Sequence, residues 1–100
     1  MLVLVGSLLT SFDSPAYASS LDGVRPLLLE CFRRAEPASC NRALEMTEAL
    51  QRRAAERELY PCQTFLLGLQ AEVVMAQLGE KRFEQASMTM QDSERLCAAL

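Results

Sequence analysis

The chain has 100 residues, among them 4 Cys but no His and no Trp. Apolar residues make up 50% and charged residues 23%, a balance that fits one small folded domain and excludes low-complexity or disordered chains. The formal net charge of −3 argues against a nucleic-acid binder, because phosphate contacts require a positively charged surface.

Residues 1–18 have the pattern of a cleavable export signal. Residues 1–9 form an apolar run, and residues 16–18 read Ala-Tyr-Ala, which places small residues at the cleavage positions. The run is shorter than the roughly 20 residues that cross a bilayer as a helix, and no Lys or Arg precedes it. A buried N-terminal helix or strand is the alternative. We expect residues 19–100 to form one domain outside the cytoplasm, in a periplasm, an organelle lumen or the extracellular space.

The remaining chain shows helical periodicity and no period-two alternation, so we expect an all-α fold. The first predicted helix runs from about residue 22 to residue 35, and a break follows at residues 36–38. Pro26 is tolerated only in a first turn, which keeps the start of this helix within residues 22–25. Ser39 is the expected N-cap of a second helix that ends near residue 60. Pro61 disfavours helical geometry in the residue before it and suits the first turn of a third helix. One continuous helix with a kink at Pro61 is the alternative.

The third predicted helix, residues 62–78, is the most apolar segment after the signal, and Gly79 suits a left-handed cap at its end. The fourth, residues 80–97, has a narrow apolar seam with steps of three and four residues. Glu80 and Glu84 lie at its expected start, where the helix dipole favours negative charge. We interpret them as solvated side chains and not as a catalytic carboxylate pair.

The cysteine spacing predicts two disulfides. Cys31 and Cys40 lie at equal distances from the first predicted turn, and Cys62 and Cys97 at equal distances from the turn near Gly79. Since such positions face each other in an antiparallel helical hairpin, we expect the bridges Cys31–Cys40 and Cys62–Cys97. The predicted fold is therefore two antiparallel helical hairpins, about four helices in all, each held by a disulfide. Four buried thiols or a zinc site are the alternatives, and zinc is disfavoured because the chain lacks His and any Cys-x-x-Cys pair.

The third predicted helix carries two apolar stripes on opposite sides. The first stripe, which would face the fourth helix, consists of Cys62, Phe65, Leu66, Leu69, Val73 and Ala76. The second stripe consists of Leu67, Ala71, Val74 and Leu78. We expect the second stripe to be buried against the first hairpin. Two opposed contact faces suit a layered stack of hairpins better than a square four-helix bundle. The alternative is a surface that binds a partner, which exposure of these side chains would indicate.

Residues 71–86 read AEVVMAQLGEKRFEQA and continue to Met90 and Ser93. With its leucine-glycine turn, the aromatic residue after it and small residues where helices would cross, the segment 62–97 resembles a tetratricopeptide-type helical hairpin. The turn-to-alanine gap is about two residues longer than in that family, and residues 39–59 do not repeat the pattern. The resemblance implies protein or peptide binding and no catalysis. The spacing of the first two cysteines is also similar to that of the plant invertase and pectin-methylesterase inhibitors, but the next interval is too short for them, so their function is not carried over.

Arg52, Arg53 and Arg57 form a basic cluster in the second predicted helix, which would contact an acidic partner or an anionic lipid surface. No dinucleotide fingerprint, phosphate loop, nucleophile elbow or zinc-protease motif occurs. We therefore expect no enzymatic activity, no cofactor and no metal. The predicted function is that of an exported helical module that binds another protein, as an adaptor, assembly or scaffold subunit. The alternative is a protein that binds a hydrophobic ligand or lies on a membrane surface.

Overall fold

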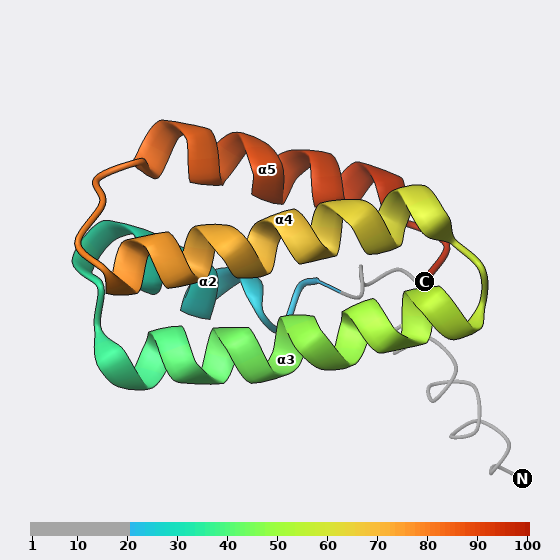
Figure 1. The fold of residues 1–100 in the computed structure, drawn as a ribbon, viewed down its shortest axis with the longest axis horizontal. Coiled ribbons are helices and arrows are strands. Elements are labelled where there is room, and N and C mark those ends of the chain that lie inside the picture. Colours follow the sequence, from blue (N-terminus) through green and yellow to red (C-terminus); the bar gives the residue numbers. More distant parts are fainter. Residues whose placement is uncertain (1–20) are drawn as a thin grey trace, which may run out of the picture.

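The computed structural model describes residues 21–100, which are helical with no strand in that range (Figure 1). The helices are α2 (Arg25–Arg34), α3 (Pro37–Glu56), α4 (Tyr60–Gln77) and α5 (Phe83–Leu96). The all-α prediction is thus confirmed for this part of the chain. The predicted export signal lies outside the described residues.

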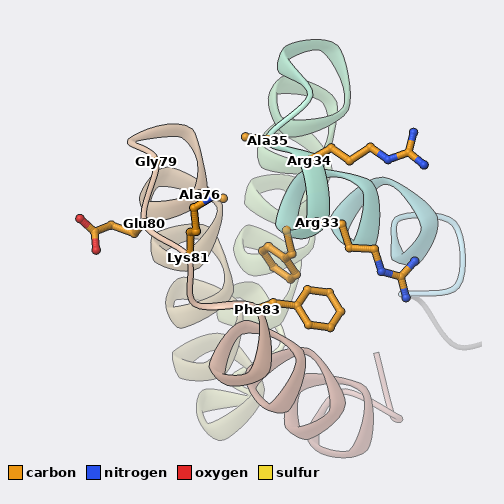
Figure 2. Close-up of a pocket in the computed structure, with 9 residues that line it drawn as sticks. Arg33, Arg34, Ala35, Ala76, Gly79, Glu80, Lys81 and Phe83 are labelled. Carbon is orange, nitrogen blue, oxygen red and sulfur yellow. The ribbon is translucent and has the colours of Figure 1, made fainter.

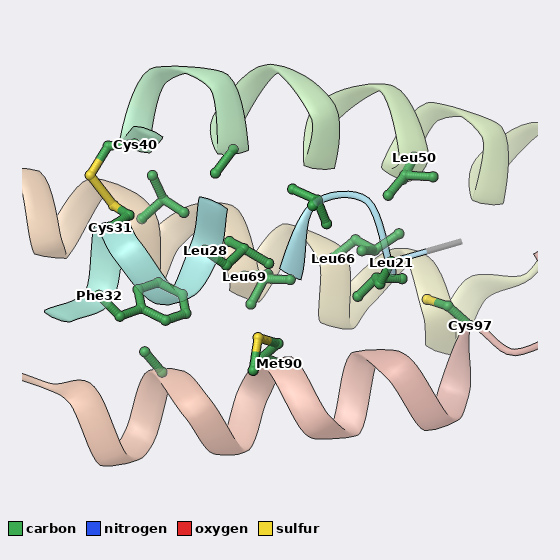
Figure 3. Close-up of a cluster of buried hydrophobic side chains, with 14 of the residues drawn as sticks. Leu21, Leu28, Cys31, Phe32, Cys40, Leu50, Leu66, Leu69, Met90 and Cys97 are labelled. Carbon is green, nitrogen blue, oxygen red and sulfur yellow. A yellow bond between two sulfur atoms is a disulfide. The ribbon is translucent and has the colours of Figure 1, made fainter. Parts of the chain in front are cut away.

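The three long helices run antiparallel to their neighbours, with α4 between α3 and α5 (Figure 1). The short helix α2 runs antiparallel to α3 and contacts α3, α4 and α5. Consecutive helices therefore form the two expected hairpins, α2 with α3 and α4 with α5. The hairpins do not stack as separate layers, however. They share one core that lies between α2 and α4 and is flanked by α3 and α5 (Figure 3).

Proline and a left-handed residue set the limits of α2. The helix begins at Arg25, after a turn, and Pro26 occupies its first turn, where a missing N–H group costs no hydrogen bond. It ends at Arg34 because Ala35 adopts a left-handed conformation with φ of 53°. The observed start lies within the predicted range of residues 22–25, and the helix ends one residue before the predicted Ala35.

The N-cap of α3 is Glu36, and the prediction of Ser39 for this role was wrong. Glu36 Oε1 accepts a hydrogen bond from the Ser39 backbone N–H at 2.8 Å, and Oε2 accepts one from the Ala38 N–H at 3.3 Å. Pro37, whose fixed φ suits the first helical position, follows directly. Ser39 thus lies inside the helix and supplies a donor that the cap satisfies.

Residues 57–59 form a short non-helical connection between α3 and α4. The helix α3 ends at Glu56, and Glu58 has a positive φ of 56°, which an α-helix does not allow. Pro61 lies in the first turn of α4. One helix kinked at Pro61, the alternative considered from the sequence, is therefore wrong.

The connection between α4 and α5 is longer than expected. Gly79 has a φ of 89°, which confirms the left-handed conformation predicted there. The helix α5 begins only at Phe83, so Glu80 lies in the connection and Glu84 alone is the acidic residue of the first turn. Arg82, the last residue of the connection, forms two hydrogen bonds with Glu72 of α4.

Both predicted disulfides are present. The bridges Cys31–Cys40 and Cys62–Cys97 have Cα–Cα distances of 4.8 Å each, and all four residues are buried. One bridge joins the end of α2 to the start of α3, and the other joins the start of α4 to the end of α5. Each hairpin is therefore covalently closed, and the thiols are not available to a metal ion.

The core is built from aliphatic side chains with the cystines at its edges (Figure 3). Its completely buried leucines are Leu21, Leu28, Leu66 and Leu69. Two buried hydroxyl groups are satisfied within their own helices: Thr47 donates to the Ala43 carbonyl, and Ser93 donates to the Thr89 carbonyl, each at 2.8 Å. A small core of this kind gains much from covalent links, since apolar burial alone stabilises a short chain only marginally.

Candidate protein-binding surface

One side of α4 is open to solvent and carries large apolar side chains. Leu67 is 47% exposed, Val74 41% and Leu78 71%, and Ala71 is also exposed. The expectation that this stripe is buried within the chain was wrong. The helices α2, α3 and α5 all pack on the opposite side and the flanks of α4, where Leu66, Leu69 and Val73 are buried.

Tyr60 extends the exposed stripe toward the start of the helix. It is 56% exposed and precedes Leu67 by seven residues, or about two helical turns, so the two side chains lie on the same side. Tyr60 is absent from the predicted stripe because the sequence placed it at the end of the preceding helix, whereas it is the first residue of α4. Its seven-residue spacing to Leu67 and Val74 is the signal that identifies it. We call this group the α4 outer surface, and it consists of Tyr60, Leu67, Ala71, Val74 and Leu78.

The α4 outer surface has the spacing of a helix-packing seam. From Leu67 onward its apolar residues follow steps of four, three and four, the pattern by which one helix packs along another. From Tyr60 to Leu78 the seam rises about 27 Å, at about 1.5 Å per residue. Such a seam offers continuous contact to one added helix.

The flank of the seam is polar but carries little charge. Gln63, Gln70 and Gln77 follow one edge of α4 at intervals of two turns. Gln77 Nε2 donates a hydrogen bond to Asn41 Oδ1 of α3 at 3.1 Å. The apolar seam is therefore bordered by neutral amide groups on the side of α3.

The three arginines of the predicted basic cluster are not brought together as one exposed patch. Arg53 and Arg57 donate to the Leu100 carbonyl oxygen at 3.3 and 2.8 Å, so they hold the last residues against α3. Arg52 pairs with Glu48 at 3.2 Å on a different side of the helix, about 100° from Arg53. The first role of these groups is internal to the domain.

A second feature lies at the end of the bundle near the Cys31–Cys40 bridge. A cavity of about 390 Å³, partly open to solvent, separates the end of α2 from the connection between α4 and α5 (Figure 2). Its lining residues are Phe32, Arg33, Arg34, Ala35, Ala76, Gly79, Glu80, Lys81 and Phe83. No motif in the sequence indicated it, because its two sides are about fifty residues apart in the chain.

Charged and aromatic side chains are in contact at this cavity. The guanidinium carbon of Arg33 lies 5.3 Å from the centre of the Phe83 ring, within the range of a cation–π interaction. Arg34 pairs with Glu30 at 3.3 Å. Across residues 21–100, by contrast, no carboxylate lies within ion-pair distance of Arg33 or Lys81.

Two further properties bear on function. Among the described helices, none combines the length and the apolar character that crossing a membrane requires. Within residues 21–100, no group of three or more Cys, Asp or Glu side chains is arranged to hold a metal ion.

Comparison of the chain with protein families, with curated proteins and with solved structures gives no match.

Proposed function

We propose that this chain is an exported, disulfide-linked helical module that binds another protein through the α4 outer surface. The observation that carries the proposal is the exposure of four large apolar side chains along one side of a helix, namely Tyr60, Leu67, Val74 and Leu78. Contiguous apolar surface of this kind marks interaction sites, because exposure of such a patch to water is unfavourable.

The partner is expected to present an amphipathic helix. The alternating steps of three and four residues place Leu67, Ala71, Val74 and Leu78 in one seam, into which the side chains of a second helix interdigitate. Ala71 lies in the middle of the seam, and its small side chain lets the backbones of the two helices approach closely there. This geometry favours a helix over an extended strand.

Export is supported by two features. Residues 1–18 have the signal pattern described above. The two buried disulfides agree with folding in an oxidising compartment, since cytosolic reductants keep most thiols reduced. The resemblance of residues 62–97 to a tetratricopeptide-type hairpin adds support for a protein or peptide ligand.

Membrane-surface binding is the alternative function, and the flank of α4 argues against it. Helices that lie on a membrane surface carry Lys and Arg beside the apolar face, where these cations contact anionic headgroups. Here the edge toward α3 carries Gln63, Gln70 and Gln77. The net charge of −3 also gives no general attraction to an anionic bilayer.

The test is photo-crosslinking in the compartment to which the chain is exported. A photoreactive amino acid at Leu67 or Val74 should give one protein adduct, whose crosslinked peptide maps to an amphipathic helix of the partner. The same amino acid at Met88, which is 62% exposed on α5, is the matched control and should not give that adduct.

The double variant Leu67→Ser/Val74→Ser should weaken binding of the identified partner at least tenfold, while Met88→Ser leaves it unchanged. Flotation of the purified chain with vesicles of 3:1 phosphatidylcholine and phosphatidylglycerol tests the alternative. Vesicle binding that is lost in the double variant, with no protein adduct at Leu67 or Val74, would refute the proposal.

A further inference from the structure

The cavity at the end of the bundle is separate from the α4 outer surface and has a different character. It is formed by the end of α2 and the connection that leads into α5 (Figure 2). The α4 outer surface, by contrast, is apolar with neutral flanks. The two features therefore suit different ligands.

We infer that this cavity binds an acidic peptide segment that has an apolar side chain next to a carboxylate. The apolar side chain would lie between Phe32 and Phe83, and the carboxylate would pair with Arg33, with the charge of Lys81 on the other side of the cavity adding attraction. This site goes beyond the proposed helix contact and rests on the proposed function only in the choice of a protein segment as the ligand.

The walls supply the apolar half of the site. Phe32 is largely buried in the core, and Phe83 is 37% exposed, so the second ring keeps part of its surface free (Figure 3 shows the position of Phe32). The methyl group of Ala76 completes the apolar lining. Aromatic rings and a methyl group gain free energy when an apolar side chain displaces water from between them.

The rim supplies the charged half. Arg33 and Lys81 have no ionic partner among residues 21–100, although the described part of the chain holds many carboxylates. Of the charged residues that line the cavity, three are cations and one, Glu80, is an anion whose side chain points away from Phe83 (Figure 2). A carboxylate at this place would form a charge-assisted hydrogen bond with Arg33 and would be attracted by Lys81 on the other side of the cavity (Figure 2).

The cation–π contact explains how Arg33 is held near an apolar wall. The Arg33 guanidinium carbon lies 5.3 Å from the centre of the Phe83 ring, so this side chain is already partly ordered. A ligand that pairs with Arg33 therefore loses less free energy to side-chain ordering. The cavity is partly open, so it covers one side chain while the rest of a peptide continues into solvent. The cavity therefore suits one side chain of a longer peptide.

The experiment is a titration followed by NMR on the ¹⁵N-labelled, disulfide-bonded protein. The probe is the acetylated and amidated peptide Gly-Phe-Glu-Asp-Gly, and the matched control peptide is Gly-Phe-Gln-Asn-Gly. We expect saturable shifts of the amides of Ala35, Gly79 and Phe83, and at least tenfold weaker binding of the control peptide. Binding should also weaken between 20 and 300 mM NaCl, because salt screens the charge pairs.

Variants separate the site from a general charge effect. Binding of the acidic peptide should weaken by about threefold in Lys81→Gln. It should weaken at least tenfold in the double variant Arg33→Gln/Lys81→Gln. Arg95→Gln, which removes an exposed arginine from α5 far along the chain, should leave it unchanged. Since Lys81 is exposed and makes no cation–π contact, its single variant tests the site even if loss of Arg33 alters local packing.

Three outcomes would overturn the inference: equal binding of the two peptides, absence of amide shifts up to millimolar peptide, and tighter binding of phenyl phosphate than of the acidic peptide. Leu67→Ser/Val74→Ser should bind the peptide as the wild type does. Failure of the peptide titration with retained crosslinking at Leu67 would therefore refute the cavity site alone, and the reverse result would refute the helix contact alone.

Discussion

Arg82 and Glu72 form a two-point ion pair that holds the connection between α4 and α5. Arg82 Nε and Nη2 lie 3.1 and 2.9 Å from Glu72 Oε1 and Oε2, and Glu72 is buried. Hydrogen bonding to this carboxylate, together with its negative charge, raises the pKa of Arg82. Because Arg82 lies directly between Lys81 and Phe83, the pair determines where these two cavity residues stand.

Glu72→Gln should lower the free energy of unfolding by more than the control below, because the largely buried Glu72 carboxylate is lost and the partly exposed Arg82 guanidinium is left without its charged partner. Asp92→Asn, which breaks an exposed pair with Arg95, is the matched control and should change it by less than about 0.5 kcal/mol. Urea unfolding measures both values. Equal effects of the two substitutions would contradict the role assigned to Glu72.

The two disulfides should contribute unequally. The Cys62–Cys97 bridge closes a sequence separation of 35 residues and Cys31–Cys40 one of only 9. In the chain-entropy description, a longer closed loop restricts the unfolded chain more, which gives about 4 and about 2.5 kcal/mol. Replacing each pair by alanine and measuring the melting temperature tests the order. A larger loss for the Cys31–Cys40 pair would contradict it.

Acid should weaken the cap of α3. The backbone N–H of Ser39 is the main cause of a lowered pKa of Glu36, and the Ser39 side chain adds to it. Since the folded pKa lies below the ordinary value of 4.5, this carboxylate stabilises the fold above that value and loses its effect as pH falls through the folded pKa.

Glu36→Gln is therefore expected to be less stable than the wild type at pH 7, and the difference should shrink as the pH falls below about 4. Urea unfolding at several pH values between 3 and 7 measures the two curves. A difference that stays constant down to pH 3 would show that the charge of Glu36 does not contribute to the cap.

Replacing Gly79 by alanine and replacing Ala35 by glycine should change the stability of the fold in opposite directions. Gly79→Ala should destabilise by about 1 kcal/mol, since φ is 89° there; a Cβ would meet no atom within 4 Å, so the cost is conformational only. Ala35→Gly should stabilise by up to about 1 kcal/mol, because Ala35 has a φ of 53° at a helix end. Thermal unfolding measures both. The same sign for the two variants would contradict this explanation.

Leu66 and Leu67 are sequence neighbours with different roles. Leu66 is fully buried, and Leu66→Ala should cost about 2–5 kcal/mol through the cavity it leaves. Leu67→Ala should cost less than about 1 kcal/mol and should instead weaken binding of the partner. Urea unfolding and a binding titration, made on both variants, measure the two effects. A large stability loss for Leu67→Ala would indicate that the α4 outer surface belongs to the core.

The helices and the cysteine pairing could be predicted because their causes are local. Pro61 and Gly79 interrupt the helical pattern, and cysteines at equal distances from a turn face each other in any antiparallel hairpin. Helix ends were less predictable because neighbouring residues compete for the same role. Glu36 and Ser39 are both able to cap a helix, and the position of Pro37 at the first turn favours Glu36.

The sequence alone determined that residues 62–78 carry two apolar stripes, because that property depends only on side-chain type and helical spacing. Which stripe is buried was decided by the tertiary structure. The helix α2 packs on the side of Leu66 and Leu69, between α3 and α5, and no described helix covers the side of Leu67. The meeting of Arg33 with Phe83 was decided in the same way, since it requires two distant segments to reach one end of the bundle. Periodicity identifies the apolar faces of a helix, but only the arrangement of the other helices determines which of these faces is buried.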